Sequence, residues 1–126
     1  MLLWIIVGLA MYLAMIYLPA LLFIRTEGVT THAGSRDDLP DGGKYVGRAR
    51  RALANTQENM PIFLTLGVLA LVVDGADMAR AIFGAQLFVF GRIAYTSLYL
   101  ISIPWTRSAA YGVGLVGCVL MALALI

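Results

Sequence analysis

Residues 2–24 read LLWIIVGLAMYLAMIYLPALLFI, a stretch that contains no charged side chain. As a helix with a rise of about 1.5 Å per residue, it would be about 35 Å long, enough to cross the hydrocarbon core of a bilayer. It lacks the basic start, shorter apolar run and small-residue cleavage site of a signal peptide, so we interpret it as a membrane-spanning helix. This stretch predicts an integral membrane protein of the all-α class.

The composition of the whole chain supports a membrane environment. Of its 126 residues, 61% are hydrophobic and 13% are charged, whereas soluble domains carry charge on about a quarter of their residues. The net charge of +2 is too small to suggest a nucleic-acid partner. The single cysteine, Cys118, has no pairing partner, and we interpret the single histidine, His32, as a solvated loop residue. We therefore expect the lipid bilayer as a partner, no nucleic acid, and no metal.

Three further apolar segments follow, and together they predict a single domain, residues 1–126, folded as a four-helix membrane bundle. The spans are expected at about residues 2–24, 45–73, 77–101 and 105–126. Residues 25–44 are rich in glycine, aspartate and basic side chains and are expected to form a loop. Gly75 favours a helix end, Asp77 a helix cap, and Pro104 the first turn of the last helix.

The basic residues predict the orientation. Six lysines and arginines lie between residues 25 and 51, and Arg107 lies in the turn before the last span, whereas the 74–80 connection holds only Arg80. By the positive-inside rule, the first loop and the 102–107 turn face the cytoplasm and both termini lie outside.

Polar side chains form one stripe on each of three predicted helices. The stripes are Arg51, Asn55 and Glu58; Arg92, Tyr95, Thr96 and Tyr99; and Arg107, Ser108 and Tyr111. Spacings of three, four and seven residues place the members of a stripe on one helix face. The distance of each stripe from the span ends puts all three in the cytoplasmic half of the bilayer. A charge at mid-bilayer costs about 2.5–3.5 kcal/mol, so we expect the stripes to face one another and form a polar ligand pocket.

A purely structural interpretation is also available. An ion pair of Glu58 with Arg92 or with Arg51 would lock helices together, although it does not explain why amide and hydroxyl groups gather at the same depth. The small residues Ala110, Gly114 and Gly117 we interpret as positions of close helix packing.

The segments that carry these stripes resemble a known family. They are RARRALANTQENMPIF at residues 48–63, Gly91 to Tyr95 with Tyr99, and Arg107-Ser108 with Tyr111. They resemble the MAPEG family, the membrane-associated proteins in eicosanoid and glutathione metabolism. The resemblance covers residues 48–111 well and residues 1–47 in topology only. The 25–44 loop resembles that of bacterial members, which implies the inner membrane of a bacterial cell, with the active site on the cytoplasmic side.

The resemblance implies a homotrimer of four-helix subunits, with glutathione as cofactor between neighbouring subunits. It implies a catalytic role for Arg107, which would lie beside the glutathione sulfur. From its chemistry, the hydroxyl of Ser108 is a second catalytic candidate, which could donate to the same sulfur or to a substrate oxygen. The glutathione-binding residues that it implies are Arg51, Asn55, Glu58, Tyr95 and Tyr99, with Arg25 contributed by a neighbour. The stripes add Arg92 and Tyr111 to this set.

The chemistry of these side chains suits glutathione, which has two carboxylates, one ammonium and one thiol. Arginines can hold the carboxylates, and Glu58 is the deep acid available for the ammonium. Arg107, near the start of a helix, would stabilise the thiolate, since a thiol with a pKa near 8.5 is mostly protonated at neutral pH. We therefore expect a membrane-bound glutathione-dependent transferase or peroxidase that acts on lipophilic electrophiles or hydroperoxides.

Two other functions stay open. One is a small four-span exporter that uses a membrane glutamate, although such exporters carry it in their first span. The other is a non-catalytic MAPEG-like membrane protein. Members that act on eicosanoids have other residues where this chain has Leu53, Ala54 and Asn59, which argues against eicosanoid activity.

Overall fold

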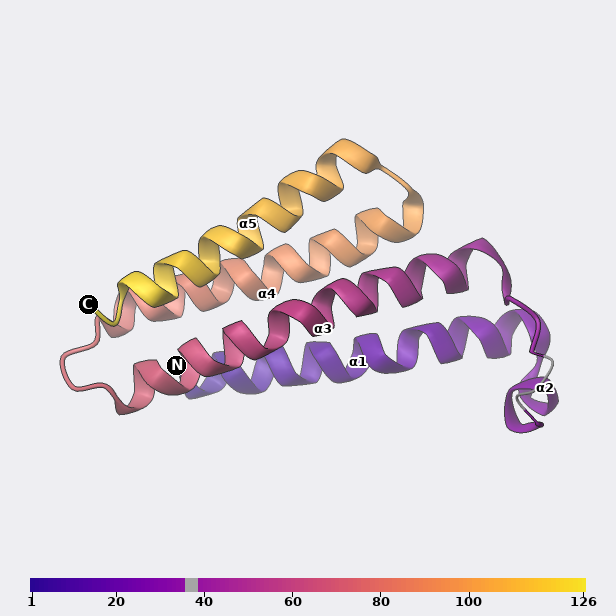
Figure 1. The fold of residues 1–126 in the computed structure, drawn as a ribbon, viewed down its shortest axis with the longest axis horizontal. Coiled ribbons are helices and arrows are strands. Elements are labelled where there is room, and N and C mark those ends of the chain that lie inside the picture. The colour runs from indigo at the N-terminus through magenta and orange to yellow at the C-terminus, as the bar shows by residue number, and fades with distance from the viewer. Residues whose placement is uncertain (36–38) are drawn as a thin grey trace.

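The structure, a computed structural model, describes residues 1–35 and 39–126, and in this part of the chain it contains helices and no strands. The helices are α1 (Leu2–Glu27), α2 (Val29–Ala33), α3 (Gly43–Val72), α4 (Met78–Ile101) and α5 (Pro104–Leu123). The four long helices run up and down alongside one another, and both termini lie at the end opposite α2 (Figure 1). The predicted all-α class is confirmed.

Three helices meet the expectation of membrane spans. By length and composition, α1, α4 and α5 are apolar enough to cross a bilayer. Helix α3 has 30 residues but is not among these candidates, because polar side chains recur along it from Lys44 to Asn59. The chain is therefore an integral membrane protein by its apolar helices, and a crossing by α3 stays a prediction.

The predicted loop at residues 25–44 is partly helical. Helix α1 continues to Glu27, and the short helix α2 follows Gly28, whose φ of 87° is accessible mainly to glycine. His32 lies in α2, is half-buried, and has its ring centroid 5.8 Å from that of Phe23, so the interpretation as a solvated loop residue was wrong. Residues 36–38 of the predicted loop lie outside the described residues.

Helices α4 and α5 pack through glycines. A Cβ atom on Gly117 would lie 2.5 Å from the carbonyl oxygen of Gly84, and one on Gly91 would lie 2.8 Å from the backbone nitrogen of Gly114. Real Cβ atoms essentially never approach other atoms this closely, so the two backbones are in direct contact. The interpretation of the small residues of α5 as positions of close packing is confirmed.

Helices α4 and α5 begin at the residues that the sequence predicted. The Asp77 carboxylate accepts a hydrogen bond of 3.0 Å from the Arg80 backbone N–H, and the Asp77 N–H donates to the Ala124 carbonyl at 2.8 Å. At the other end, Pro104 stands in the first turn of α5, after Ser102 with a φ of 66°. The turn at Ser102 and Pro104 determines where α5 begins, and so the position of Arg107.

Aromatic packing holds α3 against α4. The Phe63 and Phe88 rings stack with centroids 4.4 Å apart and an interplanar angle of 6°. Both side chains are fully buried. Arg92 follows Phe88 by one helical turn, so this core brings the polar stripes of α3 and α4 to adjacent positions.

Candidate functional site

Two arginines from different helices meet at Tyr99 of α4. The Arg51 Nε–H of α3 donates a hydrogen bond of 3.2 Å to the Tyr99 hydroxyl. The Cζ atom of Arg107, from the first turns of α5, lies 4.4 Å from the centroid of the Tyr99 ring. We call Arg51, Tyr99 and Arg107 the arginine–tyrosine cluster. The structure thus brings the three predicted stripes together at the end of the bundle that contains the α4–α5 turn.

Two more tyrosines extend this cluster into the bundle. The Tyr95 ring lies edge-on to Tyr99, with centroids 5.6 Å apart, and 6.2 Å from the Tyr111 ring of α5. Tyr95 is buried, whereas Tyr99 and Tyr111 are half-buried. The tyrosines therefore connect the surface arginines to the interior.

Arg92 forms the inner part of the site. Its side chain is fully buried, and its Nη1–H donates to the Asn55 Oδ1 atom of α3 at 2.6 Å. Its Cζ atom lies 4.9 Å from the Tyr111 ring centroid and 5.8 Å from that of Tyr95. Asn55 therefore connects the surface stripe of α3 to a buried cation.

The expected partner of these cations lies elsewhere. Glu58 is exposed on α3, and among the described residues it forms no ion pair with Arg92 or Arg51. The ion pair found in that part of the chain joins Arg80 and Asp77 at the opposite end of α4. The structural alternative of a Glu58 lock is thus not supported within one chain, and Arg51, Arg92 and Arg107 have no carboxylate partner among the described residues.

Ser108 and Arg25 lie apart from the arginine–tyrosine cluster. The Ser108 hydroxyl is exposed and donates to the Pro104 carbonyl at 3.2 Å, a bond within its own helix. Arg25 is exposed at the end of α1, where it lines a groove of about 540 Å³ with Tyr45 and Leu100. The structure therefore does not bring these two predicted residues into contact with the other candidates.

Arg48 is a site residue that the sequence analysis missed. Its Nη1–H donates to the Leu100 carbonyl at 2.8 Å, so it anchors α3 to the end of α4 beside Tyr99. Its position three residues before Arg51 places it near the same face of α3, and this spacing was the available signal.

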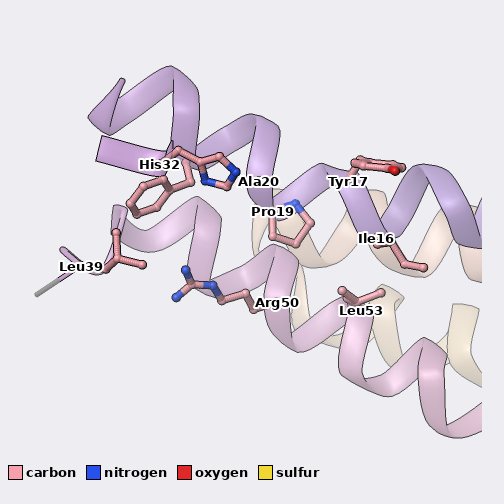
Figure 2. A pocket seen from close by; sticks show the side chains of 9 residues that line it. Ile16, Tyr17, Pro19, Ala20, His32, Leu39, Arg50 and Leu53 are labelled. Carbon is pink, nitrogen blue, oxygen red and sulfur yellow. The ribbon is translucent and has the colours of Figure 1, made fainter. Parts of the chain in front are cut away.

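A second groove is lined by residues of α1, α2 and α3. Figure 2 shows Arg50 and His32 beside this groove, which has a volume of about 490 Å³ and apolar walls that include Pro19 and Leu53. Arg50 is exposed there rather than near Tyr99. The run of arginines in α3 therefore serves two different faces of the helix.

Comparison with known proteins places the chain in a family. Residues 1–126 match the model of the MAPEG family over their whole length. The chain belongs to the MAPEG family. Over 70 residues it is 40% identical to the microsomal glutathione S-transferase 1 of Bos taurus, a match that covers 55% of this chain and 44% of the relative. The same protein of Sus scrofa is 40% identical, and that of Rattus norvegicus 39% identical, with the same coverage.

The match to these relatives covers less than half of their length. Family membership confirms the resemblance found from residues 48–111. The relatives themselves are named as microsomal glutathione S-transferases.

Proposed function

We propose that this MAPEG chain is a membrane-bound glutathione-dependent transferase or peroxidase for lipophilic electrophiles or hydroperoxides. The observation that carries the proposal is the arginine–tyrosine cluster, in which two arginines from separate helices flank one tyrosine. Membership of the MAPEG family and similarity to microsomal glutathione S-transferase 1 support glutathione as the ligand.

The side chains fit the charges of glutathione. Arg51 is exposed and has N–H groups beyond the one bonded to Tyr99, so it can bind a carboxylate through two parallel hydrogen bonds. Glu58 lies two turns along the same face of α3 and can accept hydrogen bonds from the ammonium group. Asn55 lies between them, and the Tyr99 hydroxyl is available to the peptide backbone.

Arg107 is proposed to stabilise the thiolate. Its guanidinium is half-buried on the Tyr99 ring, and in the first turn of α5 it also benefits from the positive end of the helix dipole. Bound glutathione would lose its thiol proton, and the thiolate sulfur would bond to an electrophilic carbon as a leaving group departs from that carbon. With a hydroperoxide, the sulfur would attack the O–O bond and release the alcohol, and a second glutathione would then form the disulfide and release water. Arg107 would hold the negative charge on that sulfur, and the Ser108 hydroxyl would turn from Pro104 to donate to sulfur or to a substrate oxygen.

The oligomer and its orientation are also part of the proposal. Arg51 and Glu58 are exposed on a single chain, which a lipid environment would make costly, so we propose that a neighbouring subunit covers this face. The family resemblance makes a homotrimer the expected assembly, with α3 as a fourth span and Arg25 reaching the site of the neighbour. The cluster of basic residues near the start of α3 favours a cytoplasmic site.

Calorimetric titration of the purified protein in detergent with glutathione tests this proposal. Binding is expected, together with turnover of glutathione with members of a panel of lipophilic electrophiles and hydroperoxides. The variant Arg51→Ala should bind weakly, whereas the matched control Arg80→Ala, at the opposite end of the bundle, should bind normally. Absence of binding by the wild-type protein would refute the proposal, and binding without any turnover would favour a non-catalytic protein. Substrate-dependent proton flux in vesicles would favour an exporter.

A further inference from the structure

The buried side chain of Arg92 has unused hydrogen-bonding capacity. Its exposed fraction is 0%, and one of its N–H groups donates to Asn55 Oδ1 at 2.6 Å. Its Nε and Nη2 atoms have no hydrogen-bond partner among the described residues, where they lie between the Tyr111 ring and the backbone at Gly114. Among the described residues the Asn55 oxygen therefore accepts the hydrogen bond of this buried cation, and the Tyr111 side chain also interacts with its guanidinium.

Stability alone does not account for Arg92. A buried charge without an opposite charge is costly, and apolar side chains of similar size often stabilise a core better than a buried charge does. No acidic side chain within the described residues pairs with Arg92. We therefore look for the function of Arg92 in its contact with Asn55.

This contact determines which way the Asn55 amide faces. A guanidinium group only donates hydrogen bonds, so the Asn55 atom that faces Arg92 must be the oxygen. The Asn59 Nδ2–H also donates to the Asn55 backbone carbonyl at 2.7 Å, which fixes the local turn of α3. The Asn55 Nδ2 group makes no hydrogen bond among the described residues, and the half-buried side chain belongs to the stripe that includes Arg51 and Glu58.

We propose that Arg92 is a positioning residue, which holds Asn55 so that its two amide N–H groups face the ligand. Asn55 then recognises an acceptor oxygen, either a peptide carbonyl or a carboxylate, and not a donor. This inference rests on the proposed function, since it names the role of Asn55 in the same glutathione site. Without Arg92, the amide would be free to rotate and to present its oxygen to the ligand.

The variants Arg92→Met and Arg92→Lys test this role with two separate measurements. In Arg92→Met the thermal unfolding temperature is expected to stay equal or to rise, because a buried charge is removed, while the dissociation constant for glutathione rises about tenfold. At saturating glutathione the turnover number should change much less than KM. Arg92→Lys, which can still donate to Asn55, should bind glutathione more tightly than Arg92→Met. A merely structural residue would instead lower stability and affinity together.

A double-mutant cycle with Asn55→Ala completes the test. If Arg92 acts through Asn55, the loss caused by Arg92→Met should disappear when Asn55 is already alanine. Unchanged glutathione binding by Arg92→Met beside a binding wild-type protein, or additive losses in the cycle, would overturn the positioning role and leave the proposed function standing. Absence of glutathione binding by the wild-type protein would overturn both.

Discussion

Tyr99 shows how a single residue combines the contributions of separate helices. Its hydroxyl accepts a hydrogen bond from Arg51 of α3, and its ring lies against Arg107 of α5. The electron-rich face of the ring attracts the cation of Arg107, and the Arg51 Cζ atom lies 5.9 Å from the same ring centroid. Two arginines of like charge are thus held close together, and no carboxylate of the described residues forms an ion pair with either, so this arrangement suits an anionic ligand.

The variant Arg107→Ala is expected to abolish conjugation at neutral pH while the assembly stays intact. Removal of a nearby cation raises the pKa of the bound thiol toward its free value of about 8.5, so less thiolate is present at neutral pH. The residual rate of the variant should therefore rise toward higher pH, whereas the wild-type rate should level off at lower pH. The ultraviolet absorbance of the thiolate, followed against pH with bound glutathione, measures this shift. Persistent wild-type turnover in the variant would show that the assigned role is wrong.

The variant Glu58→Gln is expected to weaken glutathione binding by about tenfold or more, because one charge-assisted hydrogen bond is lost. The charge is removed while the shape of the side chain is kept. A glutathione analogue without the amino group should bind the wild-type protein more weakly than glutathione does. Its affinity for Glu58→Gln should equal its affinity for the wild-type protein. Calorimetric titration of both ligands measures the difference, and an equal loss for the two ligands would exclude an ammonium partner at Glu58.

The residue scale also shows what sequence could and could not predict. The spacing of Arg51, Tyr99 and Arg107 on helix faces predicted that these side chains would share one end of the bundle, and the structure brings them into contact. The exposure of Glu58 and the hydrogen bond from Arg92 to Asn55 were not predictable, because helical spacing gives a face but not the rotation of that face toward a neighbour. The roles of these residues in binding and catalysis remain predictions.

At the scale of elements, the length of the apolar segments predicted which helices exist. Individual residues predicted where these helices begin or end. Asp77 and Pro104 were recognisable in the sequence as the start of α4 and of α5, and the structure has them there. Helix α2 was missed because five residues are too few to show a periodic pattern. Helix α3 was assigned as a span despite its charges, and those charges keep it out of the set of apolar helices.

Close packing of α4 on α5 predicts a graded effect of glycine substitutions. In Gly117→Ala the new methyl group would lie 2.5 Å from the Gly84 carbonyl oxygen, so the helices must separate, at a cost of about 1–3 kcal/mol. The matched control is Gly112→Ala in the same helix, where nothing lies within 4 Å of the added Cβ and alanine favours the helix. Thermal unfolding in detergent should show a lower midpoint for Gly117→Ala and an equal or higher midpoint for Gly112→Ala. Equal midpoints for the two variants would contradict the packing described for this hairpin.

At the scale of the whole molecule, the distribution of the candidate residues supports the proposal that a neighbouring subunit completes the site. Arg51 and Arg107 meet on Tyr99, whereas Arg25 lies at the end of α1, with Tyr45 and Leu100 in a separate groove. An arginine that takes part in the site of a neighbouring subunit would occupy such a position. Assembly in detergent, measured by light scattering on a sizing column, is expected to give the mass of three chains.

Subunit mixing then tests whether Arg25 acts across subunits. Arg107→Ala and Arg25→Ala chains should each be inactive alone, and co-expression with two different affinity tags isolates mixed assemblies. If Arg107 of one chain and Arg25 of its neighbour share a site, then a subunit that carries Arg25→Ala beside one that carries Arg107→Ala forms a site with both arginines present. Mixed assemblies should therefore regain a fraction of the wild-type rate, whereas a site within one chain would regain none.

A second mixture serves as the matched control, because Arg51 and Arg107 contact the same tyrosine within one chain. When Arg51→Ala and Arg107→Ala chains are mixed, every site lacks one of the two arginines, so no activity should return. Recovery in this mixture would mean that α3 and α5 of different chains build the site, which contradicts the arginine–tyrosine cluster. Recovery in the Arg25 mixture alone would assign α1 to one subunit and the cluster to its neighbour, which would explain why Arg51 and Glu58 are exposed on an isolated chain.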